Sequence, residues 1–465
     1  MTACIHDQGA NGAPERILRE RLGLDGISLV LGLGMTGFSC ARFLHRLGLP
    51  LELADDRDAP PALERIREEL SAVPVHCGEL PPGVLDRCAR LIASPGIAPD
   101  HPCIKAARDR GLPVMGDIEL FARCARSPVA AVTGSNGKST VTALLGEMAR
   151  AAGRRVAVGG NIGVPALDLL TVPEPDLYVL ELSSFQLETT DSLVPRAATI
   201  LNLSADHLDR YRDLREYLQA KLRIWRGRGV AIVNRDDALS RAAAPAAEQV
   251  VSFGSDAPPD ADSYGLRREN GRTWLVRGDE RLLAADEMRL RGGHNALNAL
   301  ATLALGAAMD LPRDAMLRAL RGFPGLPHRM EWVGERHGVV WYNDSKGTNV
   351  GATLAAIAGT DAPLVLIAGG LGKNQDFAPL GAALAGRARA LVLIGRDADL
   401  IADAVPGSVP LVRAADMDDA VAQAAALARA GDIVLLSPAC ASFDMFSGYE
   451  HRGDCFVAAY RGLPS

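Results

Sequence analysis

The stretch that decides the fold is Val129–Thr140, which reads VAAVTGSNGKST. Its apolar start, Val129–Val132, predicts a buried strand. The glycine-rich run after it predicts a turn that leads into a helix from about Thr140 to Arg150. Such a turn aims several backbone N–H groups at one point, beside the positive end of the helix dipole. The stretch therefore predicts a binding site for the phosphates of a nucleoside triphosphate.

A lysine and a hydroxyl in this loop strengthen that prediction. Lys138 supplies a mobile cation, and Ser139 supplies a hydroxyl suited to Mg²⁺. The strict phosphate-loop pattern places a glycine where this chain has Val132, so the loop is a variant. A strand–turn–helix without phosphate chemistry is the alternative. We expect ATP to contact Gly134, Ser135, Asn136, Gly137, Lys138, Ser139 and Thr140.

Length and composition limit the class of protein. The 465 residues are too many for one hydrophobic core, which predicts two or three domains. A net charge of −6, without a Lys/Arg tract, argues against nucleic acid as a partner. Eight cysteines without CxxC spacing favour free thiols in a reducing cytosol. There is no apolar signal core and no run of about 20 apolar residues. We therefore expect a cytoplasmic protein with no membrane partner.

The first section of the chain carries a second glycine-rich turn. We expect residues 1–26 to be a disordered or loosely attached leader, with a short helix over Glu15–Leu22. The strand Ile27–Leu31 then runs into Gly32–Gly37, which has the spacing G-x-G-x-x-G, and the next strand ends at Asp55. This pattern places a diphosphate on a helix N-terminus and a ribose on the acid. It fits NAD, and equally any other nucleotide diphosphate.

The second section repeats the strand–turn–helix order around the phosphate loop. Because the carboxyl ends of parallel strands share one sheet edge, we expect Glu181 and His207 to lie near Lys138. A polar insert over about Ala244–Met288 predicts a small antiparallel excursion. The predicted strands of this section are Arg155–Val158, Leu177–Leu180 and Thr199–Leu201.

The third section starts near Pro327 and again alternates strands with Ala-rich helices. Each predicted strand ends in polar residues suited to chemistry. The predicted strands are Val339–Tyr342, Leu364–Ile367, Ala390–Ile394 and Ile433–Leu436. The sequence thus predicts three consecutive αβ domains after the leader, over residues 27–115, 116–325 and 326–465.

Two residues after strands of the second section are candidate metal ligands. Glu181 directly follows an apolar run, and a carboxylate at that place beside a phosphate loop commonly holds Mg²⁺ against phosphates. A buried structural acid or a helix cap is the alternative for Glu181. His207 is an unusual Mg²⁺ ligand because this ion prefers oxygen, so a capping or loop histidine stays open.

Lys221 is the most informative single residue. The segment Asp213–Arg226 is predicted to be helical, and at about 100° per residue Lys221 falls inside its apolar stripe. A lysine at such a place usually extends its amine to solvent. Held inside, a desolvated lysine has a lowered pKa and reacts better with CO₂. The resulting carbamate is an anionic oxygen ligand that suits Mg²⁺.

Paired amides and three cations complete the candidates. Asn295 and Asn298 share one face of a predicted helix and can contact the edge of a purine, with helix capping as the alternative. Lys346, Lys373 and Arg329 offer positive charge to carboxylates or phosphates, and ordinary surface charges are the alternative.

An ordered set of motifs resembles the Mur ligase family, and the resemblance covers about residues 27–460. Folylpolyglutamate synthases resemble the second and third domains but not the first. The motifs are TGSNGKST, LELSSFQLETT, DHLDRY, AKLRI, GGHNALNA, PHRME, NDSKGTN and LSPACASFDMF, with GLGMTG, SPGI and GDIELF before them.

The resemblance implies a fold and a reaction. The fold is α/β, with a Rossmann-like N-terminal domain, a central P-loop-type mononucleotide-binding domain and a Rossmann-like C-terminal domain. The reaction is ATP-dependent amide bond formation that adds D-glutamate to UDP-N-acetylmuramoyl-L-alanine through an acyl phosphate, in peptidoglycan precursor biosynthesis. The implied cofactors are ATP, two Mg²⁺ ions and a CO₂-derived carbamate on Lys221. The expected assembly is a monomer.

The resemblance also implies individual roles. One Mg²⁺ would be held by Ser139 and Glu181, and the second by His207 and the carbamate of Lys221. Catalysis would rest on Lys138, Glu181, His207, Lys221 and Lys346. Further ATP contacts would come from Asn295, Asn298, Arg329 and Asp344. Glutamate would contact Lys346, Thr348, Lys373, Ser442 and Tyr449. The UDP-linked substrate would contact Met35, Thr36, Asp55, Asp56, Arg57, Gly96, Asn161 and His207.

The chain departs from the family at Tyr449, where phenylalanine is usual, and Lys221 is placed by AKLRI because the spacer after His207 varies. The competing hypotheses are an NAD(P)-linked oxidoreductase built on Gly32–Asp55 and a nucleotide-binding regulator without turnover. Among ligases, residue chemistry alone does not separate D- from L-glutamate as the acceptor. We also expect the third domain to close over the second, because an acyl phosphate must be kept from water.

Overall fold

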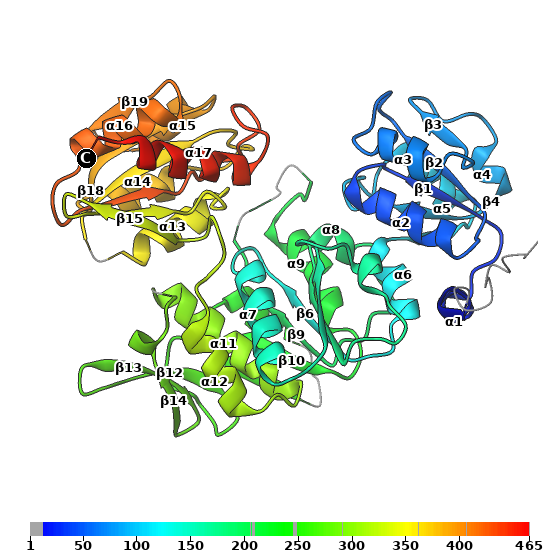
Figure 1. The fold of residues 1–465 in the computed structure, drawn as a ribbon, viewed down its shortest axis with the longest axis horizontal. Helices are drawn as coiled ribbons and strands as arrows, with labels where there is room; N and C mark the ends of the chain where they lie inside the picture. Colours follow the sequence, from blue (N-terminus) through cyan, green and yellow to red (C-terminus); the bar gives the residue numbers. More distant parts are fainter. Residues whose placement is uncertain are drawn as a thin grey trace, which may run out of the picture.

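The computed structural model describes residues 13–204, 206, 210–244, 249–290, 292–360, 362–405 and 407–464. Three αβ domains follow one another along the chain, and the N-terminal and C-terminal domains form separate lobes on either side of the central one (Figure 1). The predicted α/β class with three consecutive domains is confirmed.

The N-terminal domain is a parallel sheet with helices against both faces. Its order is β3-β2-β1-β4-β5, so the direction of winding reverses between β1 and β4. In such sheets ligands bind at the carboxyl ends of the strands beside this reversal. The strands are β1 (Ile27–Leu31), β2 (Leu51–Asp55), β3 (Val75–Cys77), β4 (Cys88–Ala93) and β5 (Val114–Met115). The helices are α2 (Met35–Arg46), α3 (Leu63–Glu69), α4 (Val84–Arg87) and α5 (Pro102–Asp109).

The expectation of a loosely attached leader is wrong for the residues before Ile27 that the structure describes. Helix α1 (Ala13–Leu22) confirms the predicted short helix, and Leu18 and Leu22 on one of its faces are each only 2% exposed. Arg21 forms an ion pair with Glu174 of the central domain. A helix with apolar residues four apart buries that stripe against a neighbour, here α6 (Asp117–Cys124), beside which it lies in Figure 1. Residues 1–12 lie outside the described part.

The central domain is built on a sheet of order β14-β13-β12-β11-β10-β9-β6-β8-β7. Neighbouring strands from β7 to β12 in this order pair in parallel, whereas β12 with β13 and β13 with β14 pair antiparallel, so the antiparallel excursion predicted for about 244–288 is confirmed for β12 to β14 and wrong for β11. These three strands extend the main sheet and do not form a separate unit. The strands are β6 (Val129–Thr133), β7 (Val156–Gly160), β8 (Leu177–Glu181), β9 (Ala197–Ile200), β10 (Val230–Asn234), β11 (Val250–Phe253), β12 (Tyr264–Glu269), β13 (Arg272–Arg277) and β14 (Glu280–Ala284).

Alternate residues of β6 enter different hydrophobic clusters. Ala130 and Val132 pack with the helices on one face, while Ala131 joins the cluster on the other face that continues into the N-terminal domain. This is the two-residue period of a strand buried on both sides. The helices are α7 (Lys138–Ala151), α8 (Ser184–Leu187), α9 (Leu214–Leu222), α10 (Ala238–Ala242), α11 (Gly293–Ala308) and α12 (Arg313–Gly322), with short 3₁₀ turns η1 (Ala166–Leu169), η2 (Arg223–Trp225) and η3 (Ala285–Glu287).

The C-terminal domain has the sheet order β15-β16-β20-β17-β18-β19, parallel except for β15. The four predicted strands are present, and the edge strands β15 and β19 were not predicted. The strands are β15 (Glu331–Arg336), β16 (Val339–Asn343), β17 (Leu364–Gly369), β18 (Ala388–Ile394), β19 (Leu411–Arg413) and β20 (Ile433–Leu436). The helices are α13 (Val350–Ala358), α14 (Ala378–Leu384), α15 (Ala398–Ala404), α16 (Met417–Leu427) and α17 (Tyr449–Gly462). Within the described residues, no helix combines the length and apolarity needed to cross a bilayer.

Candidate active site

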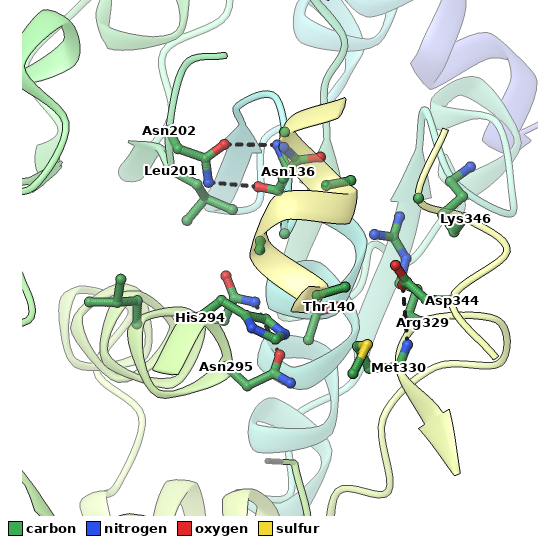
Figure 2. Close-up of a pocket in the computed structure, with 18 of the residues that line it drawn as sticks. Asn136, Thr140, Leu201, Asn202, His294, Asn295, Arg329, Met330, Asp344 and Lys346 are labelled. Atoms are coloured by element: carbon green, nitrogen blue, oxygen red, sulfur yellow. Dashed lines mark hydrogen bonds between the residues drawn. The ribbon is translucent and has the colours of Figure 1, made fainter. Parts of the chain in front are cut away.

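The loop between β6 and α7 is held by its own glycines and by a neighbouring strand end. Gly137 has φ +83°, a left-handed backbone that favours glycine, and a Cβ there would lie 2.5 Å from Asn298 Oδ1. The amide N–H of Asn136 donates to Asn202 Oδ1 at 2.8 Å, and Asn202 Nδ2 donates back to the Asn136 carbonyl at 3.1 Å (Figure 2). Asn202 therefore fixes the loop, a role that needs a partner 66 residues away and so was missed from the sequence.

The lysine and serine of the loop are already engaged. Lys138 Nζ donates to the carbonyls of Gly134 at 3.0 Å and Ser135 at 2.8 Å. Burial lowers the pKa of Lys138 from its ordinary value, and the charge of Glu181 opposes that shift. Ser139 Oγ accepts a hydrogen bond at 2.7 Å from Arg329 at the start of the C-terminal domain. Two domains thus meet at the phosphate loop.

Glu181 ends β8 and lies beside this loop, as predicted. It is 2% exposed, and its Oε1 accepts from Asn161 Nδ2 at 2.8 Å. Its Oε2 is buried and has no hydrogen-bond partner among the described residues. A buried carboxylate oxygen without a partner is costly unless a cation or a donor reaches it. This oxygen and the Ser139 hydroxyl are the hard ligands that Mg²⁺ prefers.

Lys221 points inward from α9, as its helical phase predicts. The side chain is 1% exposed, and its Nζ donates to the Gly134 carbonyl at 3.0 Å and to Thr133 Oγ1 at 3.3 Å. The same Nζ lies 4.4 Å from the centre of the Tyr217 ring. Burial, followed by the nearby charge of Lys138, lowers the pKa of Lys221 well below its usual value. The shift is in the direction that favours the neutral, nucleophilic form of this amine.

These side chains share a cavity of about 260 Å³ at the carboxyl edge of the central sheet, and Lys346 and Thr348 of the C-terminal domain also line it. The part of the chain that the structure describes holds no group of three His, Cys, Asp or Glu side chains placed to bind a metal. His207 lies outside the described residues, so its predicted position near Lys138 stays a prediction.

A second cavity of about 300 Å³ adjoins the first and is lined by both predicted asparagines. Asn295 and Asn298 are buried on one face of α11, and Asn298 Nδ2 donates to Asn295 Oδ1 at 3.3 Å. His294 precedes them and lines the same cavity, although the sequence did not single it out. Its signal was its place inside the GGHNALN motif. Figure 2 shows His294 and Asn295 extending from α11 into this space.

Asp344 and Arg329 reach this cavity from the C-terminal domain. Asp344 Oδ1 accepts from the Met330 amide at 3.2 Å and Oδ2 accepts from Ser437 Oγ at 2.7 Å. Burial raises the pKa of Asp344 to about 7. Thr140, Asn136 and Gly137 of the phosphate loop close the other side. The cavity thus joins amide groups suited to a base with cations suited to phosphates.

Only some of the residues assigned to the glutamate site lie together in the structure. Lys346 Nζ lies 3.6 Å from the centre of the Tyr449 ring, and burial lowers the pKa of Lys346 to about 8. Ser442 is buried in the loop that follows β20, whereas Lys373 is exposed. Neither Lys373 nor Ser442 lines the cavity that contains Lys138 and Glu181.

The first domain presents its glycine-rich turn with Asp55 beneath it. Asp55 is 3% exposed, and its carboxylate accepts from the Leu33 amide at 2.6 Å and from the Arg57 amide and guanidinium. Burial raises the pKa of Asp55, but the hydrogen bonds from Arg57 and Leu33 together outweigh it and lower the pKa to about 2. Both oxygens therefore already organise the turn. Met35 is 70% exposed, and Asp56 pairs with His101 at 2.7 Å.

Comparison with known proteins also indicates the Mur ligase family. Residues 27–116 match the Mur ligase MurD-like, N-terminal domain, residues 132–306 the Mur ligase middle domain and residues 328–440 the Mur ligase, glutamate ligase domain. A protein of Nitrosococcus oceani named UDP-N-acetylmuramoylalanine--D-glutamate ligase is 53% identical over 94% of this chain and 97% of its own. One of the same name from Pseudomonas putida is 53% identical over 94% and 98%.

A solved structure shares the fold. MurF ligase from Thermotoga maritima in complex with ADP gives a TM-score of 0.60 at 16% identity, covering 95% of this chain and 96% of that one. The family models span all three domains, and the relatives match at more than half of their positions. The chain belongs to the Mur ligase family.

Proposed function

We propose that this chain adds D-glutamate to UDP-N-acetylmuramoyl-L-alanine with hydrolysis of ATP, as a step of peptidoglycan precursor synthesis in the cytoplasm. The observation that carries the proposal is the 53% identity, over 94% of the chain, to relatives named for this reaction. The oxidoreductase alternative is set aside, because the residues that suggested NAD lie within the match to the Mur ligase N-terminal domain. Lys138, Glu181 and Lys221 in one cavity favour turnover over a purely regulatory role.

The first chemical step joins two anions and needs positive charge around them. The L-alanyl carboxylate attacks the γ-phosphorus of ATP, which forms an acyl phosphate and releases ADP. Lys138 is held at the loop by two carbonyls, and Arg329 reaches the same place through Ser139. Both cations offset charge on the transferring phosphoryl group. Adenine and ribose take the cavity lined by Asn295, Asn298 and Asp344.

Two Mg²⁺ ions are part of the proposal. Ser139 and Glu181 would hold one, and the partnerless Oε2 of Glu181 supports this assignment. His207 and a carbamate on Lys221 would hold the second, and the buried amine with its lowered pKa fits reaction with CO₂. When bound, the ions neutralise phosphate charge and align the attacking and leaving oxygens.

The second step forms the amide. The neutral amino group of glutamate attacks the acyl carbon, and the tetrahedral intermediate collapses to the amide and inorganic phosphate. Lys346 and Thr348 line the reaction cavity, and Lys346 is positioned to bind a carboxylate. Lys373, Ser442 and Tyr449 complete the glutamate site in this proposal. Lys373, Ser442 and Tyr449 are not among the residues that line this cavity, so we propose that the C-terminal domain moves to bring them in.

The UDP end of the substrate occupies the first domain. Met35 and Thr36 begin α2 directly after the glycine-rich turn, where a diphosphate would meet the start of the helix. Arg57 binds Asp55, whose carboxylate accepts from the turn, and Gly96 lies in the loop after β4. Asp55 supports this turn, and Asp56 lies beside it. Asn161, which donates to Glu181, would contact the substrate nearer the reaction. We further propose that the enzyme acts as a monomer.

Isotope transfer tests the proposed chemistry. The substrate is prepared with ¹⁸O in the L-alanyl carboxylate and incubated with ATP, Mg²⁺ and D-glutamate. An acyl phosphate requires that one ¹⁸O moves to inorganic phosphate and that the other remains in the new amide. Mass spectrometry of both products gives the answer. Phosphate without ¹⁸O, or no amide product, would overturn the proposal.

A further inference from the structure

The side chain of Arg210, in the central domain, forms hydrogen bonds to a loop of the N-terminal domain. Its guanidinium donates through Nη1 to the Pro95 carbonyl at 2.9 Å and through Nη2 to the Ile97 carbonyl at 3.1 Å. The side chain is 11% exposed. Both carbonyls belong to the loop that follows β4, so one side chain spans the two domains.

Two side chains of the central domain contact this guanidinium, and a third holds one of them in place. Arg210 forms an ion pair with Glu188, which also accepts from the Tyr211 hydroxyl at 2.6 Å. The Phe185 ring packs against the guanidinium, with the ring centre 4.1 Å from Arg210 Cζ. A planar guanidinium with a carboxylate, two carbonyls and an aromatic face around it has little freedom to move. The contact is therefore a rigid one.

The loop that Arg210 binds, which follows β4, supports the glycine-rich turn of the first domain. The Ser94 amide donates to the Leu31 carbonyl at 2.9 Å, which ties the loop to β1 just before the turn. The loop also lies so close to the turn that a Cβ on Gly32 would be 2.9 Å from Ser94 Cβ and from Ile97 Cγ1. The path from Arg210 to Gly32 thus runs through one short loop.

We infer that Arg210 is a positioning residue that sets the UDP-substrate loops of the first domain against the phosphate-loop domain. The inference rests on the proposed function, since it assumes that the glycine-rich turn holds the UDP end. Arg210 acts through the carbonyls of Pro95 and Ile97 and is not a catalytic residue. Its loss frees the loop, so that the UDP-binding turn is no longer held in one conformation before the substrate arrives; binding must then order it, which weakens the binding of the UDP-linked substrate.

Steady-state kinetics of Arg210→Lys test the inference. Lysine keeps the charge but cannot bond to both carbonyls and Glu188 from one planar group. We expect KM for UDP-N-acetylmuramoyl-L-alanine to rise by about tenfold or more, as for loss of a charged hydrogen bond. KM for ATP and for glutamate should stay within about twofold. The matched control is Arg212→Lys, because Arg212 is 87% exposed and, among the residues that the structure describes, its side chain pairs with Glu216 of its own segment alone.

The outcomes separate the inference from the proposed function. If the unmodified enzyme releases no phosphate with all three substrates, the proposed function fails. If that enzyme is active and Arg210→Lys leaves every KM unchanged, or raises KM for ATP equally, the inference alone is overturned. Glu188→Gln provides a second variant that keeps the side-chain shape and weakens the hold on Arg210. It should raise the same single KM by a smaller factor, and no change there would also count against the inference.

Discussion

Replacing Gly137 by alanine should weaken ATP binding by a predictable amount. At φ +83° a non-glycine residue in the left-handed region costs roughly 1–2 kcal/mol. The new Cβ would lie 2.5 Å from Asn298 Oδ1, so Asn298 must move and its hydrogen bond to Asn295 is lost, at about 1 kcal/mol. The free loop can relax, but ATP needs the original shape. About 2–3 kcal/mol of binding energy should therefore be lost, roughly 30- to 150-fold in Kd.

Calorimetric titration with a non-hydrolysable ATP analogue measures this loss. Gly153→Ala is the matched control, because Gly153 also has a left-handed φ of +75° but has open space around its Cβ position, at the far end of α7. It should leave Kd unchanged. In an Asn298→Ala background the contact is absent, so Gly137→Ala should then add only the backbone cost. A Gly137→Ala enzyme that binds within about twofold of the original, or an identical penalty in both backgrounds, would refute the reasoning.

Three further predictions concern the reaction cavity. Because burial lowers the pKa of Lys346 to about 8, its positive charge is lost as pH rises through 8, and kcat/KM for glutamate should fall there. Lys346→Arg stays charged, so this fall at alkaline pH should disappear in the variant. Identical pH profiles for the two enzymes would contradict the role of Lys346. Lys221→Ala should lose activity and recover part of it with added formate or acetate, whereas Lys138→Ala should not recover; an unimpaired Lys221→Ala enzyme would exclude the carbamate. Small-angle scattering should show compaction when the ATP analogue and the UDP-linked substrate are both bound, and an unchanged radius of gyration would rule out closure of the C-terminal domain.

Features set by neighbouring residues were predictable from the sequence. The strand, turn and helix around Lys138, the acid at the end of β8 and the strands β16, β17, β18 and β20 of the third domain follow from apolar runs and glycine positions. The inward direction of Lys221 follows from the helical period alone, and its side chain is 1% exposed. These are local rules, and the structure confirms them.

Features that depend on distant partners were not predictable. Asn202 fixes Asn136 from the loop after β9, and Arg210 binds carbonyls more than a hundred residues earlier. Helix α1 is anchored because Leu18 and Leu22 find a surface on the central domain side, which a short polar-looking segment does not reveal. The edge strands β15 and β19 exist because a neighbour offers unpaired backbone groups. Asp55 looked like a ribose ligand, yet its oxygens are occupied by Leu33 and Arg57.

The proposed reaction is tested most directly by phosphate release from ATP with UDP-N-acetylmuramoyl-L-alanine, with D-glutamate compared to L-glutamate. The account predicts release that needs the UDP-linked substrate and the amino acid together, with D-glutamate strongly preferred and one amide formed per phosphate. Release without the UDP-linked substrate, or equal rates with both enantiomers, would contradict it.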